Sequence, residues 1–377
     1  MAAKKTQLAL VLVLIAVALW RWSGIVRTPT VLPDEQVYLR AAQHLGLGES
    51  PYDEPGYFYP PPIATFVLAA SARLGEIGAL QLLRALSLAG LTLAVWLSLL
   101  AISCPWWMRL AAGAAYITLA PAVEIATALG NAAGIAAGLV LVGLFSWRRR
   151  PLLAGVALGI GLAFKPVAPL APLLLALHRP TDSTRNHLIA AIVSIPAAAL
   201  ACLGGLRHLP GLLTNARGHS NPYNFSLHKL FGDLGVDMPA LLLLALIAVA
   251  TILVMRRRVL GQPQFLSLVV TTNLVALPIL WAHSLLILLP VQLLALELAF
   301  ATPRSSWRSK TPVRAHTMLA MLAVTATLLA HATGTTYGVP GWGTVIIRAI
   351  PLTAIPFLGW FVVSSLDSRR HLLPPGH

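Results

Sequence analysis

Long apolar stretches separated by short polar segments run along almost the whole chain, and this alternation predicts the fold class. Stretches of about 18 residues or more are long enough to cross a hydrocarbon core roughly 30 Å thick as helices. The first covers residues 7–24 and the last covers 346–366. We therefore expect an all-α, polytopic membrane protein of about twelve transmembrane helices, forming a single integral membrane domain over residues 1–377.

Composition supports this prediction and excludes a nucleic-acid-binding protein. Of the 377 residues, 57% are hydrophobic and 10% are charged, whereas about a quarter of a soluble domain is charged. The formal net charge is +15, but the basic residues gather in short segments between apolar stretches, as at 148–150 and 256–258. This is the positive-inside pattern of membrane proteins. We expect membrane lipids as partners and no nucleic acid.

The basic residues also predict the orientation of the chain. Lys4 and Lys5 place the start of the first helix in the cytoplasm, so residues 25–59 lie outside. The same N-terminal stretch resembles a cleaved signal peptide. We interpret it as an uncleaved helix because the apolar run continues through Trp20. Both termini are then cytoplasmic in a multi-pass protein of the cell membrane.

Two segments of this topology are not predicted to be single membrane-spanning helices. Residues 60–75 cannot cross the membrane fully if the later helices keep their orientation. We expect a short, partly embedded helix there, opened by prolines, within a first external region over 25–78. Residues 152–179 predict a helical hairpin with Lys165 at its outward tip. A second external loop follows over 207–238.

Most carboxylates fall on the outer side of this topology. Because the orientation rule gives Asp and Glu little weight, their segregation is additional information. Asp34 and Glu35 open a predicted amphipathic helix in the first external loop, closed by Gly46 or Gly48. Asp34 is either a helix N-cap or a catalytic carboxylate, and Glu35 is either a functional acid or a first-turn residue favoured by the helix dipole.

Other candidate side chains lie on the same outer side. A lysine at the centre of a membrane helix costs about 2.5–3.5 kcal/mol, so Lys165 either binds a lipid phosphate or extends to the interface without a partner. His283, two residues after Trp281, occupies a boundary between two apolar stretches. The aromatic segment 52–62 and the polar segment 218–232 suit sugar recognition, but they equally suit an interfacial belt and a solvated loop.

Several sequence motifs are missing. The chain has no Walker A loop, no HExxH and no paired-cysteine metal site, and Cys104 and Cys202 read as core residues. We therefore expect no cofactor and no metal. An enzyme of this design would take a lipid-linked donor rather than a nucleotide sugar. The competing classes are a transporter or lipid flippase, which would place its ionisable groups near the membrane midplane, and a non-catalytic assembly partner.

The order of short motifs resembles that of the polyprenol-phosphate-mannose-dependent α-1,2-mannosyltransferases and related arabinofuranosyltransferases, glycosyltransferase family 87, which have the GT-C fold. The motifs are Asp34-Glu-Gln-Val-Tyr38, Phe58-Tyr59-Pro-Pro61, Gly130-Asn131, Lys165-Pro166, Asn224-Phe-Ser226-Leu227 and Trp281-Ala-His283-Ser284. Asn131, Phe225 and Ser284 replace a glutamine, a glutamine and a histidine that are usual in the family.

The resemblance implies an inverting glycosyltransferase that moves a mannosyl residue from a polyprenyl-phosphate donor to a hydroxyl of a lipid-linked glycan, on the extracytoplasmic face. The alternative donor within the family carries arabinofuranose. Asp34 would be the catalytic base, Lys165 would bind the donor phosphate, and His283 would serve in either role. The remaining candidates, as sugar or acceptor contacts, are Glu35, Tyr38, Tyr59, Asn131, Asn224, Ser226 and Trp281.

Overall fold

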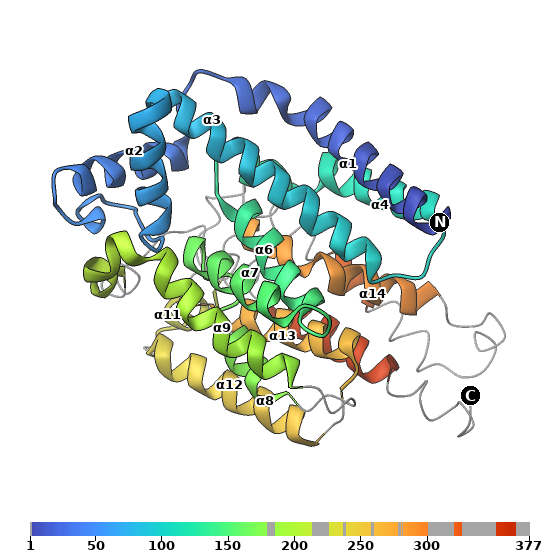
Figure 1. Ribbon diagram of the computed structural model, residues 1–377. Coiled ribbons are helices and arrows are strands. Elements are labelled where there is room, and N and C mark those ends of the chain that lie inside the picture. Colours follow the sequence, from blue (N-terminus) through green and yellow to red (C-terminus); the bar gives the residue numbers. More distant parts are fainter. Residues whose placement is uncertain are drawn as a thin grey trace, which may run out of the picture.

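The computed structural model describes residues 2–178, 185–212, 226–236, 239–257, 260–277, 280, 282–300, 320–325 and 352–366 of the chain (Figure 1). Within these ranges all regular structure is helical and no strand occurs. The prediction of an all-α protein is therefore confirmed for the part of the chain that the structure describes.

Two helices in the described ranges are long and apolar enough to cross a membrane. They belong to α1 (Ala2–Arg27) and α3 (Pro62–Leu100). Two bent pairs raise the number to as many as four: α4 (Trp106–Leu119) with α5 (Pro121–Ala128), and α9 (Asn186–Ala201) with the segment that follows it. These helices support a membrane protein, and the expected number of about twelve spans stays a prediction.

The other helices are shorter. They are α2 (Pro33–Gly46), η1 (Pro51–Asp53), α6 (Ala133–Ser146), α7 (Pro151–Phe164), α8 (Ala171–Leu177), η2 (Leu203–His208), α11 (Leu227–Asp233), α12 (Ala240–Arg257), α13 (Gln262–Ala276), η3 (Ala282–Leu288), α14 (Leu289–Phe300) and the apolar helix Leu352–Leu366.

Two apolar stretches are interrupted, one at a glycine and one at a proline. Helix α3 is interrupted at Gly75, whose φ of +73° suits glycine because it has no Cβ. The proline-opened first part of α3 thus ends at the boundary predicted from the sequence. The apolar stretch 108–123 predicts one helix, but the structure divides it between α4 and α5. Proline is favoured at a helix start, and Pro121 begins the second piece.

Helices α3 and α6 touch through glycine. A Cβ added to Gly90 would collide with the carbonyl oxygen of Gly134, and one added to Gly138 would collide with that of Gly90. Glycine lets helix backbones approach closely where a side chain would hold them apart. Helix α6 also packs on α7, and α7 packs on α9, so these helices form a continuous layered bundle (Figure 1).

Helix α2 lies against α3 and forms a smaller core with the aromatic segment 52–62. Helical spacing predicts an apolar face of Val37, Ala41, His44 and Leu45, but the buried side chains of α2 include Tyr38, Ala41 and Ala42. Of that predicted face only Ala41 is fully buried, because α2 turns the face that carries Tyr38 towards the aromatic segment 52–62. Gly48, with a φ of +81°, follows the last turn, as one of the two predicted stop positions.

The glycine contact gives a direct test of the packing. We expect Gly90→Ala to destabilise the protein by about 1–3 kcal/mol, since overpacking forces the neighbouring backbone to move. The matched control is Gly24→Ala, because a Cβ at Gly24 in α1 meets nothing within 4 Å. Thermal unfolding in detergent should show a lower midpoint for Gly90→Ala and no loss for Gly24→Ala. Equal midpoints for the two variants would contradict the close contact.

Candidate active site

The first turn of α2 brings the Asp34 carboxylate to the turn between α5 and α6. The backbone N–H of Asp34 donates a hydrogen bond to the carbonyl of Leu129 at 3.0 Å. Its Oδ2 accepts a hydrogen bond from the Asn131 amide at 2.5 Å and a longer one from the Tyr59 hydroxyl at 3.4 Å. Backbone and side chain of Asp34 are therefore both held against the same turn.

Asn131 connects the acidic and basic sides of the site. Its Nδ2 also donates to the Tyr59 hydroxyl at 2.9 Å, while its Oδ1 accepts from Lys165 Nζ at 3.2 Å and from the Ala133 N–H at 2.8 Å. The residue is 1% exposed. The amide is therefore buried and bonded on both sides, and the predicted contact between Asn131 and a substrate stays a prediction. Its observed role is to bridge Asp34 and Lys165.

Lys165 lies where α7 ends, in extended backbone before α8, as the predicted hairpin requires. Its side chain is buried, and Nζ lies 5.1 Å from the centre of the Tyr59 ring, within the range of a cation–π interaction. The side chain therefore turns inward to Asn131 and Tyr59, which argues against simple extension to the membrane interface. Asp34, Tyr59, Asn131 and Lys165 form one cluster from four separate segments.

Two other tyrosines of the aromatic segment 52–62 fix the position of Tyr59. The hydroxyl of Tyr52 donates to the backbone carbonyl of Tyr59 at 3.1 Å, and that of Tyr57 donates to the carbonyl of Pro60 at 2.8 Å. Tyr38 packs edge-on against the Tyr59 ring, with ring centres 5.1 Å apart. Tyr38 is fully buried and supports the Tyr59 ring, and its predicted contact with a substrate stays a prediction.

The two oxygens of the Asp34 carboxylate differ. Oδ2 is bonded to Asn131 and Tyr59, while Oδ1 has no hydrogen bond to any side chain or backbone group in the described ranges. Burial raises the pKa of this carboxyl above its usual range, although the Asn131 hydrogen bond and the Lys165 charge act to lower it. A carboxylate with one oxygen fixed and the other available is suited to accept a proton from a bound hydroxyl.

Glu35, next to Asp34, has a structural role. Its Oε2 accepts the N–H of Leu32 at 2.8 Å, so Glu35 caps the first turn of α2. The N-cap residue is Leu32, and Asp34 makes no cap bond. The alternative in which Asp34 is only a helix cap is therefore wrong, because the acid that caps the helix is its neighbour.

Glu35 and Arg84 form a buried ion pair beneath the site. Arg84 Nε and Nη2 each donate to a different Glu35 oxygen at 2.6 Å, and the two side chains are 3% and 0% exposed. Arg84 also donates to the backbone carbonyls of Ile25, Thr28 and Thr30. Both Glu35 oxygens are occupied inside the protein, and the predicted contact between Glu35 and a substrate stays a prediction.

The remaining candidates do not complete the cluster. Ser226 is buried and caps α11, its hydroxyl accepting the N–H of Lys229 at 3.2 Å. Its burial argues against direct contact with substrate. Asn224 and Trp281 lie outside the described residues. The backbone of His283 belongs to η3, but its side chain also lies outside what the structure describes.

Sequence reasoning missed Arg84, although a signal was present. Arg84 is an arginine within an apolar helix, where a charge costs about 2.5–3.5 kcal/mol on the insertion scale. Such a residue requires a partner, and Glu35 supplies it. The distance of 49 positions along the chain concealed the pair.

Breaking this pair should destabilise the fold. We expect Glu35→Gln to cost about 3–5 kcal/mol, because it leaves the Arg84 charge buried without a counter-charge. The matched control is Glu49→Gln, which breaks a contact with His44 of the same helix whose two side chains are 30% and 51% exposed, and should cost at most about 1 kcal/mol. Denaturant unfolding of both variants measures the difference, and equal losses would refute the structural role of the pair.

Comparison with known proteins identifies the family. The model of glycosyltransferase family 87 matches residues 57–287, more than half of the chain. The matched range contains Tyr59, Asn131 and Lys165, while Asp34 lies before it. No curated protein matches the chain. From the extent of this match, the chain belongs to glycosyltransferase family 87.

Proposed function

We propose that this protein is an inverting mannosyltransferase of GT-C type that uses a polyprenyl-phosphate donor and a lipid-linked glycan acceptor on the outer face of the cell membrane. One observation carries the proposal. A carboxylate, Asp34, and an ammonium, Lys165, are held by opposite ends of the same buried amide, Asn131. The family supplies the glycosyl transfer, and this arrangement supplies a base and a phosphate-binding cation.

Asp34 would act on the acceptor. Its Oδ1 would take the proton of the acceptor hydroxyl while the hydroxyl oxygen attacks the anomeric carbon of the sugar. The bond from that carbon to the phosphate oxygen breaks on the opposite side, so a β-phosphosugar gives an α-linked product. A base within about 2.6–3.2 Å of the hydroxyl contributes roughly 10²–10⁴-fold to the rate.

Lys165 would act on the donor. An ammonium group has three donors, so Lys165 can keep its bond to Asn131 while it binds a phosphate oxygen. The charge that develops on the departing lipid phosphate is then stabilised inside a partly buried site, where electrostatic interactions are stronger than in water. This positive charge makes a metal unnecessary in the proposed mechanism. His283, in η3 packed against α5 and α6, is proposed as a second phosphate ligand.

Substituting the base tests the proposal most directly. In Asp34→Asn, we expect transfer from polyprenyl-phosphate mannose to a crude glycolipid acceptor to fall roughly 10²–10⁴-fold, with donor binding retained. The matched control is Asp53→Asn, an exposed carboxylate of the same external region, which should leave transfer unchanged. Full activity of Asp34→Asn would remove Asp34 from the chemistry. If the wild-type protein accepts only the arabinofuranosyl donor, the sugar in the proposal is wrong and the mechanism remains.

The pH profile tests Asp34 and Lys165 together. Because the base must be ionised, the transfer rate should fall as the pH drops through the pKa of Asp34, which burial places above its usual range. Lys165→Ala removes a charge that lowers this pKa, so the acid limb should move to higher pH and donor binding should weaken. The control variant Arg73→Ala, which removes an exposed cation of α3, should change neither. An unshifted profile and unchanged donor affinity in Lys165→Ala would contradict the assignment.

A further inference from the structure

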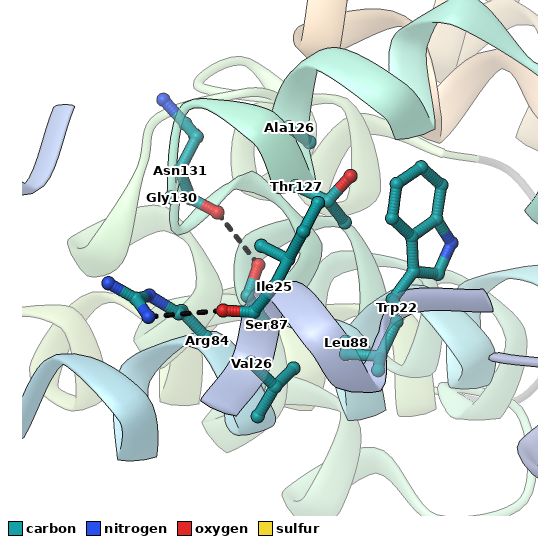
Figure 2. A pocket seen from close by; sticks show the side chains of 10 residues that line it. All are labelled: Trp22, Ile25, Val26, Arg84, Ser87, Leu88, Ala126, Thr127, Gly130 and Asn131. Atoms are coloured by element: carbon teal, nitrogen blue, oxygen red, sulfur yellow. Dashed lines mark hydrogen bonds between the residues drawn. The ribbon is translucent and has the colours of Figure 1, made fainter. Parts of the chain in front are cut away.

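Helix α3 contacts the rear of the site through two side chains one turn apart, Arg84 and Ser87. Residues at this spacing lie on the same face of a helix. Both line a small cavity of about 20 Å³ behind Asn131, together with Trp22 and Gly130 (Figure 2). Neither Arg84 nor Ser87 contacts the Asp34 carboxylate or the Lys165 ammonium through any hydrogen bond in the described ranges. Their partners, however, are the groups that hold those two side chains.

Ser87 holds the residue that bridges the site. Its hydroxyl donates to the backbone carbonyl of Asn131 at 2.8 Å and accepts the N–H of Gly134 at 3.2 Å. It therefore ties the start of α6, from the Asn131 carbonyl to the Gly134 N–H, to α3. Since that side chain carries the bonds to both Asp34 and Lys165, a shift of the Asn131 backbone moves both contacts at once.

Arg84 holds the other side of the same arrangement. Its bidentate pair with Glu35 fixes the residue adjacent to Asp34. Gly130 packs directly on that pair. A Cβ added there would lie 2.5 Å from Glu35 Oε1, and the φ of Gly130 is +69°. The segment that carries Asp34 and the turn that carries Asn131 therefore meet over Arg84 and Ser87 without space for an extra carbon.

We propose that Ser87 and Arg84 are positioning residues that set the separation between the Asp34 carboxylate and the Lys165 ammonium. This inference rests on the proposed function, in which these two groups serve as base and phosphate ligand. Ser87 acts through the Asn131 backbone, and Arg84 acts through Glu35. The sugar and its phosphate must fit between the base and the cation, so helix α3 determines the geometry of the reacting groups without touching them.

The first test compares two serines of the same helix. Ser87→Ala should lower kcat about ten- to a hundredfold with little change in KM, because small displacements of reacting groups are costly. The matched control is Ser98→Ala in α3, whose buried hydroxyl donates to the carbonyl of Ala94 in its own helix and bonds no other element among the described residues. Similar thermal midpoints with a kcat loss confined to Ser87→Ala would support positioning. Equal kcat values for the two variants would overturn it.

The second test measures the pKa of the Asp34 carboxyl and does not depend on turnover by the enzyme. Infrared difference titration, with the Asp34 band assigned by its loss in Asp34→Asn, should show a higher pKa for Asp34 in Ser87→Ala than in the wild type. The reason is that a loosened Asn131 amide stabilises the charged form less. The charged or titratable groups of the described ranges that face Asp34 are Glu35, Tyr38, Tyr59, Arg84 and Lys165, and all are unchanged in Ser87→Ala.

The two readouts separate the two proposals. If the wild type transfers no sugar from any donor but the Asp34 pKa still rises in Ser87→Ala, the proposed function fails and the positioning role stands. If transfer occurs and the pKa and kcat of Ser87→Ala match those of Ser98→Ala, the positioning role fails alone. Arg84→Lys tests the role of Arg84 separately, because a lysine keeps the positive charge but cannot form the bidentate pair with Glu35. A kcat equal to wild type in that variant would remove Arg84 from the proposal.

Discussion

The buried ion pair between Glu35 and Arg84 is the interaction on which the arrangement of the site depends. Removing two charges from water is expensive, and the attraction between them compensates only where the geometry is good and the remaining donors are satisfied. Here the guanidinium meets both carboxylate oxygens and three backbone carbonyls of residues 25–30. The same pair therefore orders the segment that leaves α1, caps α2 through Glu35, and brings Asp34 over the turn that carries Asn131.

Asn131 resolves a conflict that a base and a cation would otherwise create. In direct contact, the Asp34 carboxylate and the Lys165 ammonium would form a salt bridge, which would weaken the base and occupy the cation. The amide offers its N–H to one group and its oxygen to the other. Each charged group therefore has a neutral partner, and in the proposed mechanism Asp34 and Lys165 act on different substrates. A neutral spacer of fixed length between opposite charges thus favours two separate roles in one small volume.

The sequence predicted the helical class, the helix after Pro33, the break near residue 75 and the end of a helix at Lys165. It named Asp34, Tyr59, Asn131 and Lys165 as separate candidates, and their clustering comes from the structure. The sequence did not reveal contacts between residues distant along the chain. Glu35, Tyr38 and Asn131 have the residue types of substrate contacts, but each is buried against a partner that spacing alone does not reveal. Arg84 and Ser87 were missed for the same reason: their roles follow from the crossing of α3 with α2 and α6, which local patterns do not specify.

The glycine contact between α3 and α6 has a mechanical consequence. Because Gly90, Gly134 and Gly138 place backbone directly on backbone, the second part of α3 and α6 cannot slide past each other without steric collision. These two helices therefore form one rigid unit. Ser87 lies within this unit, and Asn131 lies in the turn that leads into α6. If the proposed lipid-linked substrates enter this site, we expect the opening to come from hinge motion elsewhere, with Gly75 and the extended backbone at Lys165 as the nearest pivots. The reacting groups would then stay in register while the surrounding helices move.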